Sequence, residues 1–410
     1  MSLAAYVAAL CDAIYNCQGD QLAAMLDLNG TRVRQAKASL SNQRSRRDTV
    51  FSGFKKLSEW PHLKDFAEAH CLSLGEPPEE AYAQQTVAAK ALRQAFGEDE
   101  IGAWLVRPMI KLAGNLYTAA VAAEAAGSNT AATQGPLEAC GGELVALFGV
   151  ARKRTDDPAK RMGALSIAVT LFKIYVTLNN PQLGRNLIAA IQSPSFPPFD
   201  SFPASQRVTY SYYLGRMAIL DDKLEEAAGH LEYALKHCLK GAHANQRRIL
   251  YYLVPVHMVY MRLPTQQMLS SHNLSIYADI AEAMRTGNVQ QLNDALSQHQ
   301  WTFIQMGTYL VLEKLRMAVY RRLFRRVQAL HAETCDPSRA HQVPLKLFHA
   351  ALVWLKDEWY QELDECECLV CNLICRNYIK GYVAHEKGIV VLSKQNPFPP
   401  AEQLTLGDPL

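Results

Sequence analysis

The chain lacks several features that would assign it at once to a large class of proteins. No uninterrupted apolar run approaches the roughly 20 residues that a membrane-spanning helix needs. The N-terminal segment has no basic start and is interrupted by Asp12, so we do not expect a secretory signal peptide. The ten cysteines show no spacing typical of a disulfide framework, which suits reduced thiols in the nucleus or cytosol. We therefore expect a soluble, intracellular protein.

Catalytic and metal-binding signatures are also missing. The sequence contains no HExxH, GxSxG, GxGxxG or Walker motif. Cys366, Cys368, Cys371 and Cys375 lie in one helical segment. At about 100° per residue Cys366 points away from the other three, so four tetrahedral ligands cannot converge. We expect the cysteines to pack in the core, and we expect no metal, no cofactor and no enzymatic activity.

A large excess of one charge is absent too. The formal net charge is +3, so any contact with nucleic acid must depend on local basic patches. Residues 31–56 form one such patch, with eight basic side chains against the single acid Asp48. We interpret this stretch as a solvated helix face or a mobile loop, with a nuclear-import signal or an RNA contact as the alternative.

The sequence does carry a helical pattern that repeats. Its 410 residues are too many for one simple core and suit two or three domains or a repeat array. Helix–turn–helix units recur over residues 160–300, and one of them has small and apolar residues at tetratricopeptide offsets. These are Leu214, Gly215, Ala227, Leu231 and Ala234. We expect a helical region over residues 1–150 and helical repeats over residues 160–305.

The C-terminal part predicts a different module. A basic helix over 307–330 and a helix over 345–355 precede an amphipathic helix that begins at Leu363. Two short β-type runs follow, beginning at Gly381 and Gly388. A helix and hairpin closing a helical array predict a winged helix over residues 306–400, followed by a tail over 401–410. The expected fold is therefore an all-α superhelical repeat, a TPR-like α-solenoid, ending in a C-terminal winged helix.

This layout resembles the PCI domain, which is shared by the proteasome lid, the COP9 signalosome and the translation initiation factor three complex. Individual segments resemble one branch more closely, namely the PCI domain-containing protein two family, which is COP9-signalosome-subunit-twelve-like. They are LFKIYVTLN, QRVTYSYYLGR, RRILYYLVPV, YRRLFRRV and YIKGYVAHEKGIVVLSKQNPFPP. The resemblance covers about Met162 to Pro400, and its most specific piece is the run from Ser393 to Pro399.

The resemblance implies a non-catalytic scaffold or adaptor subunit of a nuclear mRNA-export complex, transcription–export complex two. It implies a larger PCI-type scaffold subunit of the germinal-centre-associated nuclear protein type as one partner. A second implied partner is a small acidic, disordered protein of the deleted-in-split-hand/foot type. A nuclear location follows, with the cytoplasm as a second compartment. The alternatives are a PCI subunit of a signalosome, proteasome-lid or translation-initiation complex, and a stand-alone winged-helix DNA-binding regulator.

Basic residues near the wing are the candidate contacts for RNA or DNA. Four arginines lie one turn apart on the basic helix, and further basic residues lie in and before the wing. The set comprises Arg321, Arg322, Arg325, Arg326, Arg376, Lys380, Lys387 and Lys394. The helix that begins at Leu363 instead carries acids that would repel phosphate in its first turns, namely Asp364, Glu365 and Glu367. Three further acids precede it: Asp357, Glu358 and Glu362. We therefore expect contacts to the phosphate backbone of the nucleic acid, without sequence preference. The alternative is that these residues form a solvated or protein-facing basic strip.

The acidic partner implied by the resemblance would suit a basic, aromatic surface. Arg247 and Arg248 open a helix that also carries Tyr251, and the neighbouring repeat offers Tyr212, Tyr213 and Arg216. We expect these six residues to bind the acidic partner. The alternative is that the tyrosines belong to the repeat core while the arginines are merely exposed.

Overall fold

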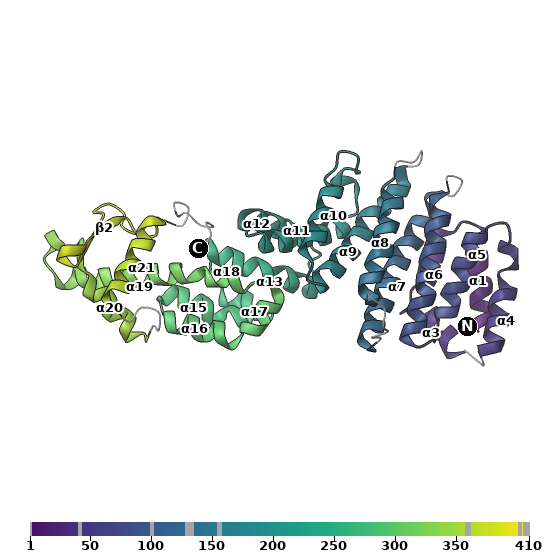
Figure 1. Ribbon diagram of the computed structural model, residues 1–410, viewed down its shortest axis with the longest axis horizontal. Coiled ribbons are helices and arrows are strands. Elements are labelled where there is room, and N and C mark those ends of the chain that lie inside the picture. The colour runs from purple at the N-terminus through teal and green to yellow at the C-terminus, as the bar shows by residue number, and fades with distance from the viewer. Residues whose placement is uncertain are drawn as a thin grey trace. The chain divides into compact units, whose positions relative to one another are not determined.

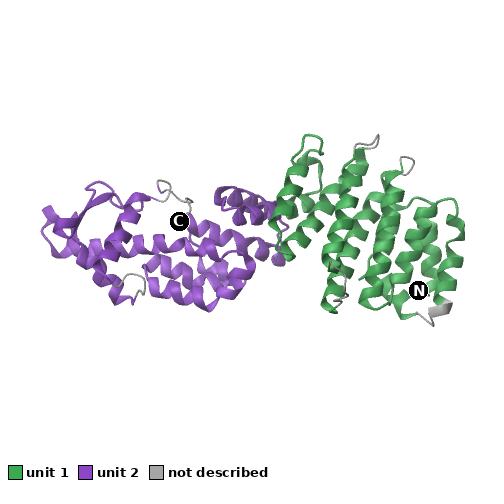
Figure 2. Ribbon diagram, viewed as in Figure 1, with its two compact units in different colours: residues 1–210 green, residues 211–410 purple. Residues whose placement is uncertain are grey.

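The computed structural model describes residues 2–39, 43–98, 102–127, 135–153, 158–356, 362–400 and 404. It forms two compact units, residues 1–210 and 211–410 (Figure 2). The finer division into residues 1–150, 160–305 and 306–400 stays a prediction. Within these described ranges no helix combines the length and apolarity that crossing a membrane demands. The acids Asp357 and Glu358 and, apart from Leu404, the tail 401–410 lie outside the described residues.

Unit 1 consists of helices that follow one another in chain order (Figure 1). They are α1 (Leu3–Tyr15), α2 (Gly19–Met25), α3 (Thr31–Ala38), α4 (Gln43–Gly53), α5 (Pro61–Ser73), α6 (Pro78–Gly97), α7 (Val106–Ala125), α8 (Pro136–Arg152), α9 (Ala164–Thr177) and α10 (Pro181–Ile191). Four of them begin with proline, which fits the first turn because its missing N–H needs no partner there. Figure 1 shows α5 to α9 stacked side by side.

A buried polar network ties α1, α5 and α6 together. The Tyr6 hydroxyl donates to the Met25 carbonyl (2.9 Å) and lies 3.1 Å from Nε2 of His70, while Nε2 of Gln85 lies 3.3 Å from Nδ1 of the same ring. Because Tyr6 already donates to a carbonyl and Gln85 donates its amide, His70 is neutral with its proton on Nε2. Burial lowers the pKa of His70 to about 4.

The predicted basic stretch over 31–56 is not uniformly solvated. Arg46 is buried, 2.7 Å from the Glu76 carboxylate, and also donates to the backbone carbonyls of Cys71 and Leu72. Arg32, Arg34, Lys37 and Arg47 are exposed. One member of the run therefore holds α4 to the end of α5.

Helix α11 (Ala204–Leu220) runs across the boundary, and unit 2 continues with short helices. They are α12 (Leu224–His237), α13 (His243–Val259), α14 (Gln266–Ser271), α15 (Ala278–Thr286), α16 (Val289–Gln298), α17 (Gln300–Met306) and α18 (Tyr309–Glu313). Gly215 packs as the tetratricopeptide pattern requires, since a Cβ there would lie 2.5 Å from Cγ of Leu231 and 3.3 Å from the Ala227 carbonyl oxygen.

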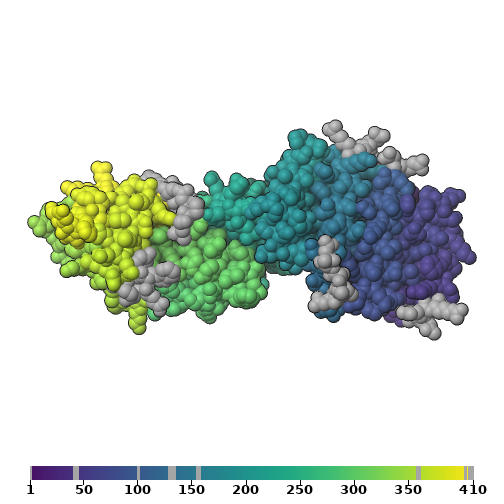
Figure 3. Space-filling model, viewed as in Figure 1, coloured from purple at the N-terminus to yellow at the C-terminus, as the bar shows by residue number. Residues whose placement is uncertain are grey.

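A winged helix completes unit 2 and confirms the predicted fold class. It comprises α19 (Leu315–Thr334), β1 (Gln342–Pro344), α20 (Leu345–Trp354), α21 (Leu363–Cys375), β2 (Gly381–Ala384) and β3 (Ile389–Leu392). The strands form an antiparallel sheet in the order β1-β3-β2, with Gln342 opposite Val391 and Gly381 opposite Leu392. In the space-filling view the described residues near position 390, coloured yellow, lie at one end of unit 2 (Figure 3).

The winged helix packs directly on the repeats through α15 and α19. Gly287 ends α15 with φ of 77°, and a Cβ there would lie 2.6 Å from the backbone nitrogen of Leu323. Arg322 donates to the Arg285 carbonyl (2.8 Å) and Arg326 to the Thr286 carbonyl (2.6 Å). Cations at a helix C-terminus are also favoured by the helix dipole. This contact is therefore both close and charged.

The expected burial of the cysteines on α21 is wrong for three of the four. Cys366 is fully buried, whereas Cys368, Cys371 and Cys375 are exposed. The larger side chains of Leu369, Val370 and Leu373 decide the orientation, because they share the inward face with Cys366. Among the residues that the structure describes, no group of three or more His, Cys, Asp or Glu side chains is placed to hold a metal ion.

Candidate functional site

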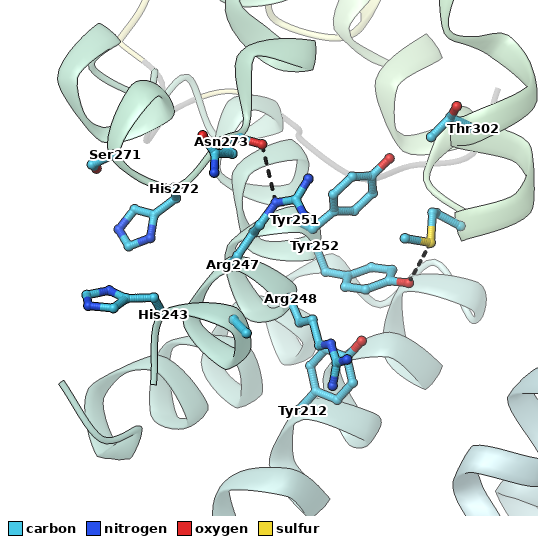
Figure 4. Close-up of a pocket in the computed structure, with 12 residues that line it drawn as sticks. Tyr212, His243, Arg247, Arg248, Tyr251, Tyr252, Ser271, His272, Asn273 and Thr302 are labelled. Atoms are coloured by element: carbon cyan, nitrogen blue, oxygen red, sulfur yellow. Dashed lines mark hydrogen bonds between the residues drawn. The ribbon is translucent and has the colours of Figure 1, made fainter. Parts of the chain in front are cut away.

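The larger candidate site is a pocket of about 640 Å³ in unit 2. Its walls come from α11, α13, the segment that ends α14, and α17 (Figure 4). In Figure 4 the two histidines lie at one end of the pocket and Tyr251 and Tyr252 at the other, with Arg247 between them. The lining residues are Tyr212, His243, Ala244, Arg247, Arg248, Tyr251, Tyr252, Ser271, His272, Asn273, Thr302 and Met306.

Four of the six residues predicted to bind an acidic partner line this pocket: Tyr212, Arg247, Arg248 and Tyr251. Arg216 lies just behind the wall, with its guanidinium carbon 4.6 Å from the ring centroid of Tyr252 and 5.7 Å from that of Tyr212. Tyr213 is only 8% exposed and packs edge-on against Tyr212. The structure thus brings the set together, with Arg216 and Tyr213 supporting the wall.

Positive charge dominates the pocket. Arg247 and Arg248 are exposed, and the Arg247 Nε donates to the Asn273 carbonyl (3.3 Å), which holds the guanidinium at the wall. His243 and His272 add two imidazoles, and Nδ1 of His272 is buried without a hydrogen-bond partner among the described residues. None of the described residues that line the pocket is acidic. The pocket is therefore suited to an anion.

Aromatic side chains form the inner wall. Burial raises the pKa of Tyr251 and of Tyr252, so both phenols are neutral and serve as apolar surface with a polar tip. The Tyr252 hydroxyl donates to the Met306 sulfur (3.5 Å). The Tyr251 hydroxyl is buried without a hydrogen-bond partner in the described part of the chain. Guanidinium groups beside aromatic faces can hold a carboxylate and an apolar side chain at once.

Sequence reasoning missed several pocket residues. His243 lies one turn before Arg247 on α13, so its spacing could have revealed it. His272, Asn273 and Met306 come from segments that the sequence does not connect to α13. Only the fold brings the end of α14 and α17 to the same pocket as α13.

The arginines of α19 have partners that the sequence did not show. Arg321 donates to the carbonyls of Tyr378 (3.2 Å) and Pro399 (2.6 Å), and burial together with the nearby Arg325 lowers the pKa of its guanidinium. Arg322 and Arg326 bind the end of α15, as described above. Arg325 and Arg326 are both exposed, but only Arg325 has no hydrogen bond to another described residue. Three of these arginines thus hold the module together.

The basic residues of the wing lie at opposite ends of the hairpin. Backbone hydrogen bonds from Ser393 to the Lys380 carbonyl and from Lys380 to the Pro397 carbonyl, both 2.8 Å, place Lys380 beside the start of the segment that carries Lys394. The side chain of Arg376 is near Tyr378, whose carbonyl binds Arg321. Lys387 lies in the turn at the other end, between β2 and β3. Arg321, Arg376, Lys380 and Lys394 therefore gather at the base of the wing.

Acids at the start of α21 lie near the wing tip. His385 Nδ1 lies 2.9 Å from the Glu367 carboxylate, which raises the pKa of His385. Glu362 and Glu365 form a capping box at the start of α21, with Asp364 in its first turn. These carboxylates lie where a winged helix that reads the major groove would present basic or amide side chains.

Comparison with known proteins agrees with this architecture. The model of the PCI domain matches residues 296–394. The chain is 37% identical over 320 residues to Enhanced ethylene response protein 5 of Arabidopsis thaliana, covering 78% of this chain and 76% of that protein. It is 36% identical to PCI domain-containing protein 2 of Danio rerio, covering 80% of each, and 32% identical to the PCI domain-containing protein 2 homolog of Drosophila melanogaster, covering 96% and 97%. The chain therefore belongs to the PCI domain-containing protein 2 family.

Proposed function

We propose that this PCI-domain protein is a non-catalytic adaptor subunit of a nuclear mRNA-export complex that couples transcription to export. In this proposal it binds a larger PCI-type scaffold subunit of the germinal-centre-associated nuclear protein type. It also binds a small acidic, disordered protein of the deleted-in-split-hand/foot type and contributes to a surface for RNA or DNA. Family membership supports the subunit role, since PCI domains recur in multi-subunit complexes.

The observation that carries the proposal is the pocket on α13, whose described lining contains arginines and no acid. Arg247 and Arg248 offer charge-assisted hydrogen bonds to carboxylates, and the rings of Tyr212 and Tyr251 offer apolar surface beside them. A disordered acidic segment can reach such a recess because it has no fold of its own to exclude it. The pocket thus supports an acidic partner more directly than it supports a small-molecule substrate.

Nucleic acid would contact the base of the wing in this proposal. Arg325 and Lys394 are exposed, and Arg376 and Lys380 are half-exposed. Contacts from such residues go to phosphates and carry no sequence information. The acidic start of α21 argues against the alternative of a stand-alone sequence-specific DNA-binding regulator.

A charge-reversal experiment tests the pocket. The double variant Arg247→Glu/Arg248→Glu should weaken binding of the acidic partner by at least about thirtyfold, or about 2 kcal/mol, because both partners would then be acidic. The control Lys223→Glu/Lys236→Glu makes the same charge change at the N-cap and in the last turn of α12, outside the pocket lining. It should change the affinity less than threefold, because both lysines are exposed. Calorimetric titration of the purified chain with the acidic protein measures both. Equal affinities of the two double variants would contradict the assignment.

A further inference from the structure

A groove of about 310 Å³ lies between α5 and α6 and is bordered by α4. Its α5 wall is a single helical stripe of Asp65, Glu68, Ala69 and Leu72. The lining residues on α6 include Val87 and Ala91, and α4 contributes Phe51. All of these elements belong to unit 1, and neither the export proposal nor the wing makes use of them.

Small residues create the hollow, and large apolar side chains flank it. Ala69 and Ala91 are 2% and 6% exposed and form its floor, where the short side chains leave space between the helices. Phe51 and Val87 remain 47% and 49% exposed. Single exposed apolar residues are ordinary, but these two border one recess, so one apolar side chain of a partner could contact both.

The rim of the groove is acidic. Asp65 is exposed, and Oε1 of Glu68 is buried without a hydrogen bond to any residue that the structure describes. Glu68 forms an ion pair with Lys64 one turn earlier, but Nζ of Lys64 lies 3.8 Å from Oε1 of Glu68, which is too far for a hydrogen bond. Lys90, the one basic side chain among the described lining residues, lies 3.4 Å from Glu143 on α8. The two carboxylates of α5 are therefore poorly compensated.

We propose that this groove docks an amphipathic helical segment of a partner protein that carries Lys or Arg one turn from a large apolar side chain. The apolar side chain would fill the hollow over Ala69 and Ala91, beside Phe51 and Val87. The basic group would donate to Glu68 and Asp65. Residues 65 to 72 span about 10 Å at about 1.5 Å per residue, so about two turns of the partner helix make contact. Acidic segments and nucleic acid are repelled by the same carboxylates.

A random peptide library tests the proposal, since selection does not require the partner to be identified first. Phage-displayed peptides of about twelve residues are selected on the full-length chain, and one enriched peptide is synthesised with a fluorophore for anisotropy titrations. Enriched peptides should place large apolar residues three or four positions apart, with Lys or Arg within one turn. Val87→Glu should then weaken binding at least tenfold, and Glu68→Gln about threefold to tenfold with a smaller dependence on salt.

The matched control is Val145→Glu on α8, because Val145 is 47% exposed and outside the groove lining. It should change the affinity less than twofold. Val87→Ser and Glu68→Gln keep the test decisive if Val87→Glu does not fold, as circular dichroism would reveal. Acidic or charge-free enriched peptides, enrichment no greater than on an empty support, or equal effects of Val87→Glu and Val145→Glu would each overturn the proposal.

Discussion

Replacing Arg321 and Arg325 separately should distinguish support of the winged helix from binding of nucleic acid. Arg321 makes two hydrogen bonds to backbone carbonyls and is half-buried. Hydrogen bonds from a charged donor contribute about 1.5–3 kcal/mol, and the carbonyls would lose their partner. Arg321→Ala should therefore lower the free energy of unfolding by about 2 kcal/mol, which for a domain of this size lowers Tm by about 4–8 °C.

Arg325→Ala should show the opposite pattern. The side chain is exposed, so the change in unfolding free energy should stay within about 0.5 kcal/mol. If Arg325 contacts one phosphate of single-stranded RNA, its loss reduces the slope of log K against log salt by about 0.7. Thermal melts measure the first quantity, and anisotropy titrations of a labelled RNA between about 50 and 200 mM salt measure the second.

Two results would refute this reasoning. An Arg325→Ala variant with unchanged affinity and salt slope would remove α19 from the nucleic-acid surface. An Arg321→Ala variant that melts like the wild type would show that its carbonyl contacts contribute nothing. Reversing all four arginines at once would not separate the two effects, because Arg321, Arg322 and Arg326 all bind backbone carbonyls.

Three other predictions concern stability and accessibility. His70 binds a proton only near pH 4 when folded but near pH 6.5 when unfolded. Lowering the pH through this window should therefore reduce the free energy of unfolding by up to about 3 kcal/mol. In His70→Asn, the free energy of unfolding from urea titrations should depend less on pH over the same window. Gly287→Ala should lower the free energy of unfolding by more than about 2 kcal/mol, since its Cβ would meet Leu323, whereas Gly388→Ala, with φ of 58° and free space around it, should cost only about 1 kcal/mol in chemical denaturation. Maleimide should modify Cys368, Cys371 and Cys375 in the native protein but Cys366 only after unfolding, because Cys366 is buried and its pKa is raised to about 12. Peptide mass spectrometry measures the modification of each cysteine. Modification of Cys366 in the native protein as fast as that of the other three would contradict the packing of α21.

Local patterns in the sequence predicted the helical repeats and the wing. The spacing of Gly215, Ala227 and Leu231 predicted a tetratricopeptide-like contact, and the β-type runs from Gly381 and Gly388 predicted the hairpin. The sequence did not predict β1, because Gln342–Pro344 is only three residues long and forms a strand solely by pairing with β3. On α21 the local pattern was not sufficient to predict burial of the cysteines. Spacing showed which cysteines share a face, but only packing decides which face is buried.

The features of the candidate sites that the sequence did not predict depend on contacts between residues far apart along the chain. The acceptors of Arg321 and Arg322 lie at Tyr378, Pro399 and Arg285, too far along the chain for a spacing rule to find them. The histidine at position 272 reaches the pocket because the segment that ends α14 meets α13 there, where the Asn273 carbonyl accepts a hydrogen bond from Arg247. Charge and aromatic content on α13 were visible in the sequence, whereas the absence of acids around them required the fold.

Affinity purification of the full-length chain from cells, followed by mass spectrometry, tests the central claim most directly. The account predicts a larger PCI-type scaffold subunit of mRNA export together with a small acidic protein, and loss of the small protein from the Arg247→Glu/Arg248→Glu variant. Recovery of signalosome, proteasome-lid or translation-initiation subunits in their place would contradict the export assignment. Recovery of no stoichiometric partner would contradict the subunit role altogether.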